Sequence, residues 1–154
     1  MKKTRQDYIF VGVQLLLFVL YWFEFLPKLR MPLPVIGFSV ALSMAGIAIV
    51  VGALWKLNRN LTPFPTPKPG AQLVQTGLYK WVRHPIYTGI IISVFSVATA
   101  LGSPYKLLIS AFLLVLFYLK TQYEEKKLMQ QYTGYALYRK KTGRFFPKLK
   151  SISS

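Results

Sequence analysis

Four long apolar runs limit what this chain can fold into more than any other feature of its sequence. They cover residues 8–26, 33–55, 86–102 and 107–119. Since a bilayer-spanning helix needs about 20 apolar residues, the first two runs are long enough to span outright. The third is at the short limit, and the fourth spans only with help from interfacial residues such as Tyr105 and Lys120. We therefore expect an all-α polytopic membrane protein with about four transmembrane helices.

A turn between the third and fourth runs is marked by Gly102, Ser103 and Pro104. We expect these runs to form a helical hairpin, although the fourth run on its own also fits a re-entrant segment. The helical pattern continues through residues 120–132, and Gly134 is a suitable stop. In the second run, small residues recur at spacings of three and four, where another helix can approach closely. They are Ala41, Ala45, Ala48 and Gly52.

The length of 154 residues suits a single domain, which we take as residues 1–154. Lys2, Lys3 and Arg5 precede the first run, as in a signal peptide. However, that run ends in bulky aromatic residues with no small-residue cleavage site, so we expect a retained helix.

The chain carries a formal net charge of +16, which invites a nucleic-acid interpretation. Hydrophobic residues make up 53% of it, however, and basic loops that fix topology and touch anionic membrane lipids account for the charge. We therefore expect no nucleic-acid partner. With the N-terminus inside, 17 of the 20 Lys and Arg residues fall on one side of the membrane. This split predicts that both termini lie in the cytoplasm, and we take the membrane to be a bacterial or archaeal inner membrane.

Two segments share that cytoplasmic face, the loop 55–85 and the tail 120–154, which we expect to form a helical cap. Alternate prolines in residues 62–70 forbid a helix and favour a stiff, extended chain. Such a segment is equally consistent with a plain linker and with a rigid arm lying across a pocket. The sequence has no cysteine, which excludes disulfides and thiolate chemistry, and we expect no metal site.

Few polar residues in this chain call for a chemical explanation. Arg83 and His84 precede Pro85, which is well suited to the first turn of a helix, so they sit where free backbone amides favour an anion. A lone histidine at an interface is usually incidental, but Tyr87 and Gly89 nearby strengthen a functional interpretation. Gly89 would let a flat or bulky ligand press against the helix backbone.

Glu124 and Glu125 stand where the fourth run leaves the membrane. Lys120 and Lys127 lie at helical pairing distance from Glu124, so an ordinary ion-paired surface explains it; Glu125 fits that explanation less well. Because adjacent helical residues point about 100° apart, the two carboxylates are not expected to address one atom together. For Glu24, near the outer end of the first run, we expect an ion pair with Lys28.

Several of these residues recur in order in a known family. The shared elements are Gly77-Leu78-Tyr79, Arg83-His84-Pro85, Tyr87, Gly89, Glu124-Glu125, Leu128, Tyr135, Tyr138, Arg144 and Pro147. Over residues 60–147 the chain resembles the integral-membrane methyltransferases typified by isoprenylcysteine carboxyl methyltransferase and the phospholipid N-methyltransferases. It has fewer spans than the eukaryotic carboxyl methyltransferases, so prenylcysteine is not specifically indicated.

The resemblance implies a site for S-adenosylmethionine between the third helix, the fourth helix and the tail. It also implies a lipophilic or lipidated acceptor that enters from the bilayer. The residues expected to bind the cofactor are Tyr79, His84, Pro85, Tyr87, Gly89 and one or both of Glu124 and Glu125. Arg83 and Arg144 are the expected catalytic residues, which would steer the acceptor or the cofactor carboxylate.

Three functional questions stay open at this stage. A carboxylate acceptor needs a cation such as Arg83 or Arg144, whereas an amine acceptor needs a base such as His84 or a glutamate. A membrane reductase of related architecture would instead bind a nicotinamide cofactor. A small four-helix transporter would use Glu24 as its coupling acid, although the long loop and tail argue against that class.

Overall fold

The structure, a computed structural model, describes residues 3–57, 62–67 and 70–148. Parts of the loop 55–85 and of the tail 120–154 lie outside these residues, as do Lys2, Arg59, Lys68 and Lys150 of the charge count. The described residues form helices and no β-strand, which confirms the all-α expectation. The helices are α1 (Arg5–Tyr21), α2 (Leu33–Leu57), α3 (Pro85–Ala100), α4 (Pro104–Gln131) and α5 (Tyr135–Lys141), with the short 3-10 helix η2 (Gly77–Lys80).

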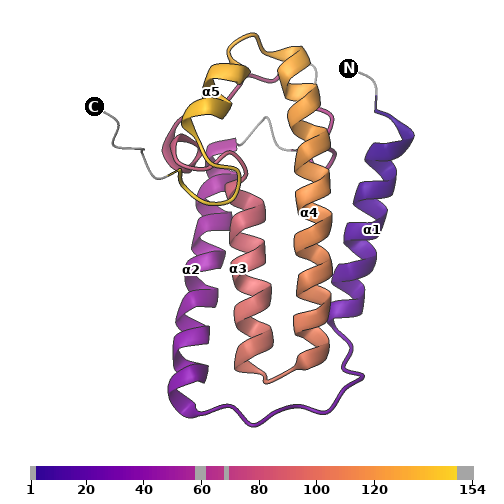
Figure 1. The fold of residues 1–154 in the computed structure, drawn as a ribbon, viewed down its shortest axis with the longest axis vertical. Helices are drawn as coiled ribbons and strands as arrows, with labels where there is room; N and C mark the ends of the chain where they lie inside the picture. Colours follow the sequence, from indigo (N-terminus) through magenta and orange to yellow (C-terminus); the bar gives the residue numbers. More distant parts are fainter. Residues whose placement is uncertain (1–2, 58–61, 68–69, 149–154) are drawn as a thin grey trace.

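The four long helices stand side by side (Figure 1). Helix α3 contacts α2 on one side and α4 on the other, and α1 packs against the far side of α4. The start of α1, the start of α3, the end of α4 and the whole of α5 gather at one end of the bundle (Figure 1). Residues that are far apart in the sequence therefore meet at that end.

The α3–α4 hairpin is confirmed by a tight turn at residues 101–103. Gly102 has a positive φ of 61°, a conformation that side chains with a Cβ rarely adopt. A Cβ there would also collide with the Leu29 carbonyl, because Gly102 accepts a 2.7 Å hydrogen bond from the Leu29 amide. The turn is thus fastened to the irregular segment between α1 and α2. Helix α4 then continues to Gln131, as the sequence pattern indicated.

Among the described residues, two helices, α2 and α4, are long and apolar enough to cross a membrane. The expectation that the first run spans outright is not confirmed, because α1 ends at Tyr21 and has 17 residues. Helix α3 has 16 residues. By contrast, α4 qualifies because its helix reaches 28 residues, well beyond its apolar core. Much of the outer surface of α2 is apolar: Phe38 is 70% exposed. Such a surface suits contact with lipid.

Helices α2 and α3 approach closely, but not along the expected small residues. Ala41, Ala45 and Ala48 are exposed. The buried stripe of α2 is offset from them, and it consists of Ser39, Ser43, Gly46 and Ala53. Two stripes of small residues share this helix, and the sequence spacing does not distinguish between them.

The far end of the bundle holds a small polar cluster around Glu24. Lys28 lies 3.9 Å from its carboxylate, which confirms the expected ion pair. Lys106 of α4 lies 3.6 Å from the same oxygen, and the Ser103 hydroxyl donates to the other oxygen. Lys106 also donates to the carbonyls of Tyr21 and Phe23, so the cluster fastens the end of α1 to α4.

Candidate functional site

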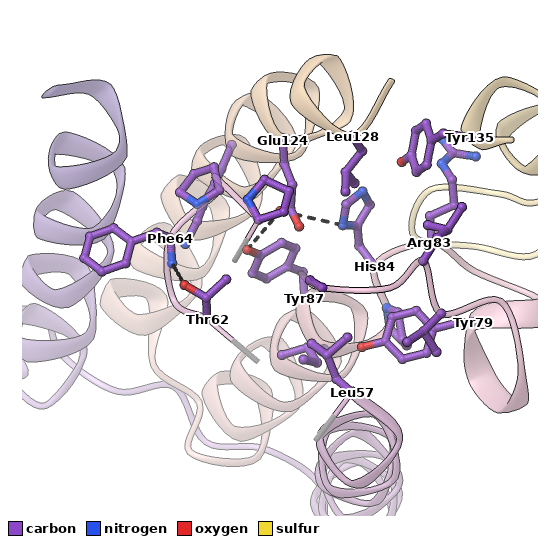
Figure 2. A pocket seen from close by; sticks show the side chains of 18 of the residues that line it. Leu57, Thr62, Phe64, Tyr79, Arg83, His84, Tyr87, Glu124, Leu128 and Tyr135 are labelled. Carbon is purple, nitrogen blue, oxygen red and sulfur yellow. Dashed lines mark hydrogen bonds and ion pairs between the residues drawn. The ribbon is translucent and has the colours of Figure 1, made fainter. Parts of the chain in front are cut away.

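A cavity of about 300 Å³ lies at the end of the bundle where α5 sits. Its walls come from the start of α3, the last turns of α4, η2, α5, residues 62–67 and Gln14 of α1. Figure 2 shows Tyr87, His84 and Glu124 pointing toward one another between α3 and α4, with Tyr79 and Tyr135 farther along. The volume is at the lower end of the range for small-molecule sites.

Six of the nine expected site residues line this cavity. They are Tyr79, Arg83, His84, Pro85, Tyr87 and Glu124. The other three, Gly89, Glu125 and Arg144, are not among its lining residues. Each of these three instead contacts other parts of the protein.

Glu125 is the centre of a buried ion cluster. It is 1% exposed, and its Oε1 accepts a 2.9 Å hydrogen bond from Arg83 Nε and lies 3.2 Å from His84 Nε2. Its Oε2 lies 3.4 Å from both Arg139 and Arg144. A buried carboxylate is tolerated when it is paired and hydrogen-bonded in this way. Glu125 therefore fixes the positions of Arg83 and His84 in the cavity wall.

Glu124 faces the cavity instead. The Tyr87 hydroxyl donates to its Oε2 at 3.4 Å, and His84 Nδ1 lies 4.0 Å from the same oxygen (Figure 2). None of the arginines that hold Glu125 pairs with it within the described residues. The 100° rotation between neighbouring helical positions separates the two carboxylates, so Glu124 is available to a ligand and Glu125 is not.

Gly89 lies where α3 crosses α2. A Cβ at Gly89 would meet the Gly46 carbonyl oxygen at 2.5 Å and the Val50 side chain at 2.7 Å. The reciprocal position, Gly46, is equally crowded by Gly89 and Ser93. Gly89 therefore allows two helix backbones to touch, and no ligand is needed to explain a glycine there.

Arg144 belongs to a segment that pairs with the start of α3. The Arg83 amide donates to the Gly143 carbonyl at 2.8 Å, and the His84 amide donates to the Arg144 carbonyl at 3.1 Å. A Cβ at Gly143 would collide with the Phe146 carbonyl, so this path requires glycine. The Arg144 guanidinium lies over the Tyr118 ring, 4.9 Å from its centre, and its Nη2 lies 3.4 Å from Glu125 Oε2.

Pro85 begins α3 as expected, and His84 occupies the position before it, the N-cap. The Thr88 hydroxyl donates to both the His84 and the Phe145 carbonyls, which ties the first turn of α3 to the tail. The Arg83 guanidinium also donates to the Thr142 carbonyl. Contacts with the first turn of α3 and with residues 142–145 of the tail thus hold Arg83 and His84 in place.

Three buried tyrosines form the α5 side of the cavity. The Tyr138 hydroxyl donates to the Tyr79 carbonyl at 2.6 Å, and burial raises the pKa of Tyr138 to about 12. Burial likewise raises the pKa of Tyr79 and of Tyr135 above the usual range. Tyr135 is 1% exposed, yet its hydroxyl has no hydrogen-bond partner among the described residues. A buried hydroxyl without a partner is uncommon and calls for one.

Lys120 and Gln14 are cavity residues that the functional interpretation of the sequence missed. The Lys120 ammonium donates to Gln14 Oε1 at 2.6 Å and to the Pro63 carbonyl at 2.9 Å. Lys120 directly follows the apolar core of α4, and this position in the sequence could have indicated a cavity residue. Gln14 lies in α1, where nothing in the sequence indicates a site.

Residues 62–67 form one wall of the cavity, so the arm interpretation of the proline-rich segment holds for its described part. Thr62, Pro63, Phe64, Pro65 and Pro67 all line the cavity. No cluster of potential metal ligands is found in the part of the chain that the structure describes.

The fold and the cavity define a class of protein: a helical membrane protein whose bundle carries, at one end, a mostly apolar cavity with a few polar side chains. The family model for phospholipid methyltransferase matches residues 35–136, which is 102 of the 154 residues. The chain therefore belongs to the phospholipid methyltransferase family, as the sequence motifs indicated. Membership implies methyltransferase activity on lipid-like substrates. No curated protein matches the chain.

Proposed function

We propose that the cavity binds S-adenosylmethionine and that the protein transfers its methyl group to a lipid-like acceptor held in the membrane. The observation that carries the proposal is the Tyr135 hydroxyl, which is buried in the cavity wall and has no hydrogen-bond partner within the described ranges. Glu124, which faces the same space, supplies a carboxylate. A ligand that offers both a cation and hydrogen-bonding oxygens satisfies both groups, and S-adenosylmethionine offers a sulfonium, an ammonium, a carboxylate and ribose hydroxyls.

Four residues would hold the cofactor in this proposal: Tyr79, His84, Glu124 and Tyr135. When bound, the cofactor supplies an electrophilic methyl group, which carries the reactivity. The protein then needs to align the acceptor and exclude water. Glu125 contributes indirectly, because it fixes Arg83 and His84 from behind the wall.

The acceptor that the cavity fits best is an amine on a phosphate-bearing lipid. Lys120 and Glu124 are one helical turn apart on α4 and both line the cavity, so a cation and an anion stand side by side. A zwitterionic head group complements this pair: Lys120 donates to the phosphate, and Glu124 receives the proton that the amine must lose. The apolar core of α4 ends at Leu119, so this pair lies where a lipid head group would sit.

A carboxylate acceptor is the second candidate. It needs a cation and no base, and the buried ammonium of Lys120 meets that need. The arginines expected for this role, Arg83 and Arg144, both pair with Glu125. This arrangement makes carboxylate methylation the less favoured of the two reactions.

We also propose that all four long helices lie in the bilayer with both termini in the cytoplasm, and that residues 1–154 act as one domain. The charge distribution supports this topology, since 17 of 20 basic residues fall on one side. A cytosolic cofactor must reach the cavity from that side.

The first experiment is calorimetric titration of the detergent-purified protein with S-adenosylmethionine and S-adenosylhomocysteine. We expect saturable binding by the wild type and its loss in Glu124→Gln. Transfer of a labelled methyl group would then be compared between vesicles that contain phosphatidylethanolamine and vesicles that contain a lipophilic carboxylate. If the folded wild type binds NADPH and neither methyl-donor ligand, the reductase interpretation replaces this one.

A further inference from the structure

The residues 62–67, which we call the proline arm, are hydrogen-bonded to the helices at two points. At one, the Pro63 carbonyl accepts the hydrogen bond from Lys120 of α4. At the other, the Thr66 amide and hydroxyl donate to the two carboxylate oxygens of Asp7 in α1, at 3.1 and 2.6 Å. The arm is therefore held by side chains from helices that are distant in sequence.

Asp7 is the most buried acid in the described structure. It is 0% exposed, and its carboxylate also accepts from the Thr4 amide at 2.7 Å. Lys127 of α4 lies 3.4 Å from Asp7 and donates to the Thr66 hydroxyl at 2.5 Å. Asp7, Thr66 and Lys127 thus form a closed three-residue cluster that joins α1, the arm and α4.

This cluster affects the cavity as well as the helix bundle, because the neighbours of Thr66 line the cavity. Pro65, next to Thr66, is fully buried and lines the cavity, as do Phe64 and Pro67. The Phe64 ring is packed edge-on against Tyr8 of α1, with ring centres 5.2 Å apart. Prolines cannot donate backbone hydrogen bonds, so the arm has few means of its own to stay in place.

We propose that Asp7 is a positioning residue, which acts through Thr66 to hold the proline arm as a wall of the ligand cavity. Asp7 lies outside residues 35–136, the part of the chain that matches the family. The inference rests on the proposed function for the identity of the ligand, but not for the position of the arm. A misplaced wall impairs ligand alignment even where the fold survives.

The test compares three variants of the full chain. Asp7→Asn removes the charge, and Thr66→Val removes the hydroxyl between the arm and α1 while the ion pair from Asp7 to Lys127 remains. Glu24→Gln is the matched control, because Glu24 is also a paired acid that joins the segment after α1 to α4, at the opposite end of the bundle. Affinity for S-adenosylhomocysteine is measured by calorimetry, and melting temperature is measured for each variant.

A second readout does not depend on any ligand. Within the arm, the residues that carry a backbone N–H are Thr62, Phe64 and Thr66, since the others are proline. Amide hydrogen exchange over residues 62–67 therefore reports the hold on the arm directly, through the bond from the Thr66 amide to Asp7.

We expect Asp7→Asn and Thr66→Val to speed exchange in the arm and to weaken S-adenosylhomocysteine binding by about tenfold or more. Glu24→Gln should lower the melting temperature without changing either quantity. Unchanged exchange in Asp7→Asn, or wild-type affinity despite faster exchange, would overturn the proposal. If the wild type itself does not bind the ligand, the proposed function fails, and the exchange comparison still decides whether Asp7 holds the arm.

Discussion

Glu124 and Glu125 are neighbours in the sequence, yet they serve different surroundings: Glu125 is enclosed by Arg83, His84, Arg139 and Arg144, and Glu124 faces the cavity. The Glu125 carboxylate thus holds the residues of the site in place, and the Glu124 carboxylate is exposed to a ligand in the cavity. This division is the basis of the first prediction.

Glu125→Gln should destabilise the protein by on the order of 3 kcal/mol, because it leaves buried basic groups without their counter-charge. Glu124→Gln should change stability little and should abolish measurable cofactor binding. Denaturant unfolding in detergent, paired with calorimetry, separates the two effects. Equal destabilisation by both substitutions would contradict the division.

Tyr135→Phe should leave the ligand-free protein as stable as the wild type or more so, since the hydroxyl has no partner to lose in the part of the chain that the structure describes. Binding of S-adenosylhomocysteine should weaken by roughly tenfold, corresponding to one hydrogen bond of about 1.4 kcal/mol. Tyr138→Phe is the contrast, because its hydroxyl is already bonded to the Tyr79 carbonyl. A fall in stability with unchanged affinity in Tyr135→Phe would count against a ligand at this hydroxyl.

Gly89→Ala should destabilise the protein by about 1–3 kcal/mol, the usual cost of overpacking, because the new methyl group meets the backbone of α2. Gly37→Ala is the matched control, since Gly37 also lies in a helix and a Cβ there meets nothing within 4 Å. That substitution should be neutral or stabilising. Melting temperatures of the two variants decide the question, and a tolerated Gly89→Ala would disprove the close helix contact.

Stability should fall as the pH rises from about 10 toward about 12. An unfolded tyrosine loses its proton near pH 10, whereas burial raises the pKa of Tyr138 to about 12. The raised pKa means that stability is fully present below pH 10 and is lost as the pH approaches the folded value. Thermal unfolding measured across this window checks the direction, and Tyr138→Phe should make the decline less steep. A variant with an unaltered decline would show that other groups cause it.

The sequence predicted the helical fold, the α3–α4 hairpin and the length of α4, because each depends on local pattern and on Gly102. It did not predict where α1 ends. The apolar run continues past Tyr21, but Glu24 turns away to pair with Lys106 and Ser103. Such tertiary contacts override the local preference for helix.

Only the part of the candidate site that depends on residues close together in the sequence was predicted. Residues that lie near one helix start, such as His84 and Tyr87, were found from motif and spacing. Asp7 was missed, although Thr4 and Asp7 form a recognisable helix cap. Its contact with Thr66 spans 59 positions, and no periodicity in the sequence reports a contact of that range.

The backbone pairing of Arg83 and His84 with residues 143–144 also orders events during synthesis. The ribosome delivers α3 well before the tail, so Arg83 and His84 emerge while the carbonyls of Thr142, Gly143 and Arg144 do not yet exist. Until then Arg83 and His84 can pair with Glu125 of α4 but lack their backbone partners, and a nascent chain that has made all the long helices still lacks the α5 wall of the cavity. Assembly of the site is therefore a late event, separate in time from assembly of the bundle.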